Sequence, residues 1–156
     1  MSTKLMRQFQ DEDFLLYRLP HVARMVSLIC AHEYMSYDMK PSEWRLIAQV
    51  GRFGNISAKV LSDKMALDQV TVSRSVRRCI KRKLIRGIVN PLDRRSKVLI
   101  LTPTGKVFLE RFYPHACELA LRVERGLERT EVKQLKRLLS KLNEHLGTFS
   151  PFSTAE

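Results

Sequence analysis

The sequence predicts a mainly α-helical fold with one small β-hairpin, and three observations support that fold class. Asp68 is a good helix N-cap, and apolar residues recur after it at helical spacing. A short segment with its own cap, Ser57, comes before it. Two β-branched runs, Ile85–Val89 and Lys97–Leu101, follow with turn residues between them. Helix, turn, helix and hairpin in this order are the layout of a winged helix-turn-helix.

The helix after Asp68 is predicted to have two unlike faces. On a helical wheel the buried face is apolar, with Val72, Val76, Cys79 and Ile80. The opposite face is polar and basic, with Thr71, Arg74, Arg77, Arg78 and Lys81. A packed back and a basic front suit a helix that enters a DNA groove.

Three helices are expected before this one. The first covers residues 14–34 and has an apolar seam of Leu15, Leu19, Val22, Val26 and Ile29. Pro20 predicts a kink or a restart within it, because proline removes one helical hydrogen bond. Ser42 is expected to cap a second helix that runs to about Arg52, and Ser57 a third.

Two helices are expected after the hairpin. Thr102 and Pro103 suit the cap and first position of a long helix, in which Pro114 predicts a kink. The last helix runs from about Arg129 to Leu146 with leucines at coiled-coil spacing. Such seams predict a partner subunit, although packing within one chain would give the same pattern.

The predicted organisation is one domain, residues 1–156. Residues 42–101 form its winged-helix DNA-binding unit, flanked by N- and C-terminal dimerisation helices at 12–36 and 103–146.

The charge balance points to a polyanionic partner. Lysine and arginine number 28 against 16 acidic residues, a net charge of +12. Nucleic acid and a membrane surface both fit that excess. No apolar run approaches the ~18 residues of a spanning helix, and the charged N-terminus is unlike a secretory signal. We therefore expect a cytoplasmic protein.

Catalysis and cofactors have no support in the sequence, and the residues that could converge on a zinc ion lack the usual spacing. No nucleophile elbow, phosphate loop or paired carboxylates occur at a recognisable spacing. Cys30, Cys79 and Cys117 are far apart and lack a CxxC pair, so we expect reduced and mostly buried thiols. Cys30, His32, Glu33 and His115 also lack metal-ligand spacing.

Several motifs resemble the MarR family of bacterial transcription regulators. They are DQVTVSR at 68–74, LIR at 84–86, DRRSK at 93–97 and LTPTG at 101–105. The resemblance extends weakly over about 14–146. It implies a homodimeric repressor that binds a pseudo-palindromic operator. One departure is Lys83, where the family usually has the glycine that ends the recognition helix. Lys83 therefore predicts a different helix end and leaves the hairpin angle open.

The candidate DNA-binding residues fall into three sets. Residues suited to base edges are Gln69, Thr71, Arg74, Arg77 and Arg78. Residues suited to phosphates are Ser57, Lys59, Ser73 and Lys81. At the hairpin tip, Asp93 is expected to hold one arginine while the other reaches a minor groove. The resemblance favours Arg95 for that groove, with Arg94 second.

The resemblance also implies an effector, commonly an aromatic acid or related anion, that releases the DNA. Arg18, His21 and Arg24 lie loosely on one face of the first helix, and Trp44 could stack at the edge of a pocket. Solvated arginines and a packed histidine explain the same residues. Two other functions remain open: a basic winged-helix module without sequence preference, and a redox- or metal-responsive regulator.

Overall fold

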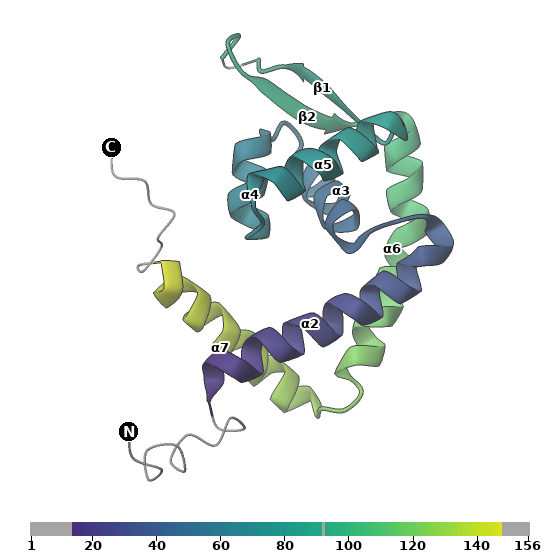
Figure 1. The fold of residues 1–156 in the computed structure, drawn as a ribbon. Helices are drawn as coiled ribbons and strands as arrows, with labels where there is room; N and C mark the ends of the chain where they lie inside the picture. Colours follow the sequence, from purple (N-terminus) through teal and green to yellow (C-terminus); the bar gives the residue numbers. More distant parts are fainter. Residues whose placement is uncertain (1–13, 92, 148–156) are drawn as a thin grey trace, which may run out of the picture. The chain divides into compact units, whose positions relative to one another are not determined.

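The computed structural model describes residues 14–91 and 93–147. In chain order they form α2 (Leu15–Tyr34), η2 (Met35–Tyr37), α3 (Pro41–Phe53), α4 (Ala58–Met65), α5 (Gln69–Lys81), β1 (Ile85–Val89), β2 (Lys97–Leu101), α6 (Pro103–Glu124) and α7 (Arg129–Gly147). Helices with one small hairpin are the predicted fold class, which is therefore confirmed (Figure 1). The chain divides into two compact units, Met1–His115 and Ala116–Glu156. Residues 12 and 13 of the predicted first segment lie outside the described residues.

Two of the predicted helix caps are present at the helix-turn-helix. The Ser57 hydroxyl accepts the Val60 N–H at 3.3 Å, and the Asp68 carboxylate accepts the Thr71 N–H at 2.8 Å. Between α4 and α5 the chain turns through Ala66, which has a left-handed φ of 47°. Each cap satisfies a backbone donor that the first helical turn leaves free, so α4 and α5 begin where the sequence predicts.

The predicted start of α3 is wrong by two residues. Lys40, not Ser42, is the cap, and Pro41 takes the first helical position. Proline suits that position because it has no N–H to leave unpaired. The Glu43 carboxylate then accepts the Lys40 N–H at 3.2 Å. Glu43 therefore lies in the first turn of α3, with its side chain turned back into the protein.

The end of α5 corrects the expectation placed on Lys83. Lys83 has a φ of 57°, the left-handed conformation that glycine usually takes at this position. Its N–H donates to the Ile80 carbonyl at 2.8 Å, and the Leu84 N–H donates to the Cys79 carbonyl at 2.9 Å. This pair of hydrogen bonds is a Schellman motif. The helix therefore ends as it would with glycine, although a lysine side chain stands there.

The hairpin follows directly and is joined to the start of α6. β1 and β2 pair antiparallel, with Ile85 opposite Leu101 and Val89 opposite Lys97, as the apolar runs predict. The Thr102 N–H donates to the Leu84 carbonyl at 3.1 Å, and the Thr102 hydroxyl accepts the Gly105 N–H at 2.9 Å. Thr102 thus caps α6 as predicted and also closes the base of the hairpin.

The core of the first unit lies where α3, α4, α5 and the first half of α6 meet. Its fully buried side chains include Leu46, Ile47, Val50, Leu61, Met65, Val72, Cys79, Ile85 and Phe112. Phe112 is surrounded by aromatic rings, with ring centroids 4.9 Å away at Tyr34 and Tyr37 and 4.7 Å away at Trp44. This packing fixes α3 against the end of α2 and the first half of α6.

The long helices continue past their prolines. α2 runs through Pro20 and α6 runs through Pro114, so neither proline is a helix boundary. No helix among the described residues is long and apolar enough to cross a membrane.

Apolar side chains remain exposed along α2, and also along the end of α6 and α7. On α2 they are Leu15, Leu16, Tyr17, Val22, Met25, Val26, Leu28 and Ile29. In the second unit they are Leu121, Val123, Leu127, Leu135, Leu138, Leu139 and Leu146. Taken unit by unit, the predicted seams therefore have largely exposed side chains.

Candidate nucleic-acid interface

The outer face of α5 is formed by Gln69, Ser73, Arg74, Arg77 and Lys81, all of them exposed. Among the described residues, the Arg74 side chain has no hydrogen-bond or ion-pair partner, and Arg77 makes only one long hydrogen bond, 3.4 Å to the Ser73 carbonyl. Free guanidinium groups can form paired hydrogen bonds with guanine or with phosphate. This face therefore has the chemistry for contact with a duplex.

The start of α5 is organised by Asp68 and Thr71. The Thr71 hydroxyl donates to the second Asp68 carboxylate oxygen at 2.6 Å, in addition to the backbone cap. These hydrogen bonds from Thr71 hold the pKa of the Asp68 carboxyl below its ordinary 3.8. Because its proton is already donated, the Thr71 hydroxyl can only accept a hydrogen bond from a base or a water.

The predicted phosphate-holding residues of α4 are at its N-terminus. Ser57 already uses its hydroxyl oxygen as the cap, whereas Lys59 is exposed on the first turn. Backbone N–H groups and the helix dipole make such an end favourable for an anion. Lys59 adds a positive charge there, which is suited to a phosphate.

The wing tip, residues 90–96, is ordered by hydrogen bonds within its own loop. The Asp93 carboxylate accepts the Arg95 backbone N–H at 3.0 Å, and the Asp93 carbonyl accepts the Ser96 N–H at 3.0 Å. Asp93 therefore orders the loop backbone, and it holds Arg95 through the backbone N–H and not through the guanidinium. Arg94 and Arg95 are exposed, and no described residue pairs with either side chain. Leu92 lies outside the described residues.

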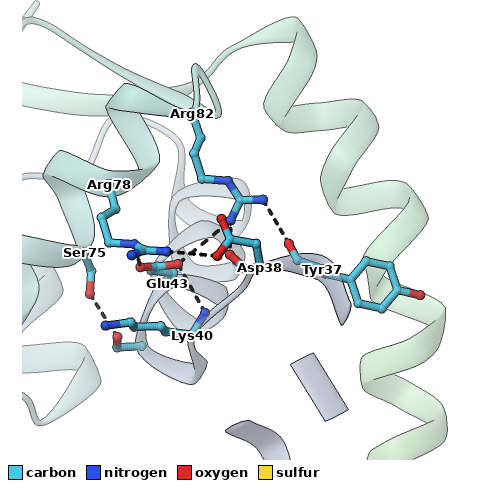
Figure 2. Close-up of polar contacts among 8 residues, drawn as sticks. Tyr37, Asp38, Lys40, Glu43, Ser75, Arg78 and Arg82 are labelled. Carbon is cyan, nitrogen blue, oxygen red and sulfur yellow. Dashed lines mark hydrogen bonds and ion pairs between the residues drawn. The ribbon is translucent and has the colours of Figure 1, made fainter. Parts of the chain in front are cut away.

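Arg78 is the one predicted base-reading residue that lies against the protein. Its Nε is 2.5 Å from the Glu43 carboxylate, and its Nη2 is 3.4 Å from Asp38 (Figure 2). The buried face of α5 is rotated from the prediction: Ser75 is buried, while Ile80 is 43% exposed. The reason is tertiary, since α3 presents a buried carboxylate to α5 and an arginine satisfies it better than an apolar residue.

Sequence reasoning missed Val70, Glu43 and Arg82. Val70 is 57% exposed in the first turn of α5, where an apolar side chain is suited to the methyl group of thymine. The signal that the sequence offered for Val70 was its apolar side chain. Glu43 and Arg82 gave none, because charged residues are expected at the surface.

The four predicted ligand residues are not brought together. Arg18, His21 and Arg24 are exposed along α2, while Trp44 packs in the aromatic cluster of Phe112. A shallow pocket of about 220 Å³ is lined by Ala31, Met35, Asp38, Met39, Lys40, Pro41 and Arg78. It contains none of the four.

The cysteines are free thiols in three environments. Cys79 is buried, Cys30 half-buried and Cys117 exposed, so the expectation of mostly buried thiols is met in part. Burial and the nearby Glu43 carboxylate raise the pKa of the Cys79 thiol to about 12. Over 14–91 and 93–147, no group of three or more His, Cys, Asp or Glu side chains could hold a metal ion.

Known proteins share both this sequence pattern and this geometry. Residues 37–96, which include α3 to the wing tip, match the model of the MarR family. The chain is 25% identical over 141 residues to IacR of Pseudomonas putida, an HTH-type transcriptional repressor, covering 90% of this chain and 84% of IacR. Over residues 37–96 the chain is therefore similar to the MarR family.

Solved structures share the fold of this chain. A MarR/EmrR family transcriptional regulator from Acinetobacter sp. ADP1 superposes with a TM-score of 0.78 at 26% identity, over 84% of this chain and 93% of that one. BpsR of Bordetella bronchiseptica, whose DNA binding is regulated by 6-hydroxynicotinic acid, has a TM-score of 0.79 at 22% identity, over 86% and 96%. The repressor and the regulator named here, to which this chain is similar, are transcription factors by their descriptions.

Proposed function

We propose that this chain is a transcriptional regulator of the MarR family, a homodimeric repressor that binds a pseudo-palindromic operator and releases it when a small aromatic acid-like ligand binds. The observation that carries the proposal is the pair of exposed cationic surfaces, the outer face of α5 and the wing tip. Both are attached to one buried core through the Schellman turn and Thr102. A solvated charge run would not need such a rigid attachment.

In the proposed complex the N-terminal half of α5 lies in the major groove. Arg74 and Arg77 would read base edges together with Gln69, and Lys59 and Lys81 would contact phosphates. Arg95, and Arg94 as second choice, would enter an adjacent minor groove, whose narrow forms attract arginine. Affinity should then fall steeply with salt, because each phosphate contact releases counterions.

The proposed dimer covers the exposed apolar residues of α2, α6 and α7 with the same residues of a second copy. Isolated apolar residues are normal at a surface, but long rows on whole helices mark an interaction site. A second copy is favoured because closed two-fold dimers are the commonest oligomers and would give two recognition helices for a two-fold symmetric site.

The proposed effector is an anion with an aromatic ring. Arg18 and His21 lie one turn apart on α2 and could pair with a carboxylate, with Arg24 beside them. The aromatic acid that regulates BpsR has this chemistry. Because the dimer would place a second α2 near the first, the missing walls of the site are expected from the partner.

The test combines the oligomeric state with a footprint. Sedimentation should give a dimer at micromolar concentration. A duplex selected from a random pool should show two protected half-sites about one helical turn, or roughly 10 base pairs, apart. A monomer, or a selection without enrichment, would reject the proposal. The competing function, a basic module without sequence preference, is favoured by the net charge of +12 and predicts that second result.

A further inference from the structure

Four charged residues join α5 to the segment that follows α2, and we name them the clamp: Asp38, Glu43, Arg78 and Arg82. Figure 2 shows Arg78 in the last turn of α5 and Arg82 just after that helix, both pointing toward Asp38 and the first turn of α3. Ser75 continues the same face of α5, and its hydroxyl donates to the Ser42 hydroxyl at 3.0 Å. Positions 75, 78 and 82 repeat at helical spacing, so one side of α5 is polar yet turned inward.

Glu43 is the centre of the clamp. Only 1% of this residue is exposed, and its carboxylate lies 2.5 Å from Arg78 Nε and 4.0 Å from Arg82 Nη1. Within the described residues, Glu43 Oε1 and Arg78 Nε have no hydrogen-bond partner apart from each other. Burying a carboxylate costs desolvation free energy, and attraction to a paired cation offsets that cost. Each of the two groups therefore depends on the other.

Arg82 extends the clamp to the connection between α2 and α3. It donates to the Asp38 carbonyl at 2.6 Å and to the Tyr37 carbonyl at 3.0 Å. Its guanidinium also lies over the Phe108 ring of α6, 5.7 Å from the centroid. Asp38 itself has a left-handed φ of 48°, so the chain reverses at the point that Arg82 holds. The C-terminal end of α5 is thus fixed to three other elements.

We propose that Glu43 is a positioning residue that sets, through Arg78 and Arg82, the angle at which α5 presents its outer face to DNA. This inference rests on the proposed function. The argument is geometric: Arg74 and Arg77 share a rigid helix with Arg78, so a rotation at the clamp moves both. Glu43 itself is buried and contacts no DNA. Arg78 accordingly leaves the base-reading set and joins the clamp.

The direction in which one substitution changes the DNA affinity distinguishes a positioning role from a simple electrostatic effect. Glu43→Gln removes a negative charge near a DNA-binding face, which by itself would strengthen DNA binding. Positioning predicts the opposite, a loss on the order of tenfold for a selected duplex. Asp63→Asn is the matched control, because it removes one exposed carboxylate from α4 and should leave binding unchanged or slightly tighter. Tighter binding by Glu43→Gln as well would overturn the inference.

Salt dependence then tests the reassigned arginine. If Arg78 acts together with Glu43 and not on DNA, the double variant Arg78→Gln/Glu43→Gln loses less than the sum of the two single losses. The slope of log affinity against log salt stays at its wild-type value. If Arg78 contacts a phosphate instead, the slope for Arg78→Gln would become less steep by about 0.9, and the losses of the two single variants would add. Either result would overturn the inference.

A measurement without DNA keeps the inference separate from the proposed function. Hydrogen exchange in free Glu43→Gln should rise about tenfold over residues 75–82 and stay unchanged in Asp63→Asn. Unchanged exchange at 75–82 would refute the clamp. If Glu43→Gln does not fold, Arg82→Gln carries the same test, because it leaves the Glu43–Arg78 pair in place. Equal wild-type binding to selected and scrambled duplexes would refute the proposed function alone.

Discussion

Gly105 faces the carbonyl of Leu84 so closely that a Cβ at this position would stand 1.8 Å from the oxygen. The first turn of α6 therefore rests directly on the backbone that joins α5 to β1. This contact explains why the LTPTG motif needs its glycine, and it sets where the wing leaves the core.

Gly105→Ala should destabilise the protein by about 3 kcal/mol, because the obstacle is backbone rather than a flexible side chain. The free energy of unfolding in urea measures the loss. Gly87→Ala is the control, since a Cβ there would meet nothing within 4 Å, and its effect should stay within about 0.5 kcal/mol. Equal effects of the two substitutions would contradict the close approach.

Lys83→Gly should stabilise the protein by about 0.5–1 kcal/mol, because a left-handed φ of 57° costs lysine more than glycine. Lys83→Ala removes the same side chain but keeps a Cβ, so it should give no gain. Thermal or urea unfolding of both variants decides the point. A gain with alanine as large as that with glycine would mean that the side chain, not the backbone, carries the strain.

Asp68 should make stability depend on pH at the acid end. Hydrogen bonds from Thr71 lower its pKa in the folded protein below the 3.8 of an ordinary carboxyl. A lowered folded pKa contributes stability that is complete above 3.8 and disappears as pH falls through the folded value. The stability difference between wild type and Asp68→Asn should therefore be constant near neutral pH and shrink below pH 3.8. If the stability difference persists at lower pH, the ionised carboxylate of Asp68 does not account for the stabilisation by the cap.

Arg74→Ala and Lys59→Ala should weaken DNA binding in different ways. Loss of a base-reading arginine relaxes the preference at one position by about 1–3 kcal/mol, whereas loss of a phosphate contact weakens all duplexes alike. Affinities for matched and single-mismatch duplexes distinguish the two. An equal loss on matched and mismatched sites for Arg74→Ala would remove it from the base-reading set.

Local chemistry made the helix starts and the hairpin predictable. Asp68, Ser57 and Thr102 act on backbone groups within three residues, so their roles are visible in sequence. Lys83 could not be predicted in this way. Two hydrogen bonds of the Schellman turn and the buried Leu84 beside it outweigh the cost of one left-handed lysine.

The inward role of Arg78 could not be predicted from the sequence, because its partner is distant along the chain. Arg78 looks like any outward cation on a helical wheel, because nothing near it in sequence reveals the Glu43 carboxylate. The exposed seams of α2 and α7 were predictable as apolar rows, yet a single chain does not identify their partner. For the same reason the DNA-facing roles of Arg74 and Arg95, and the effector role of Arg18 and His21, stay predictions.

Competition between two duplexes tests the central claim most directly. A labelled selected site is bound at physiological salt and challenged with the unlabelled site or with a scrambled duplex of the same length and composition. The account predicts that the scrambled duplex competes at least about a thousandfold less well, the lower end for specific regulators. Equal competition by the two duplexes would contradict it.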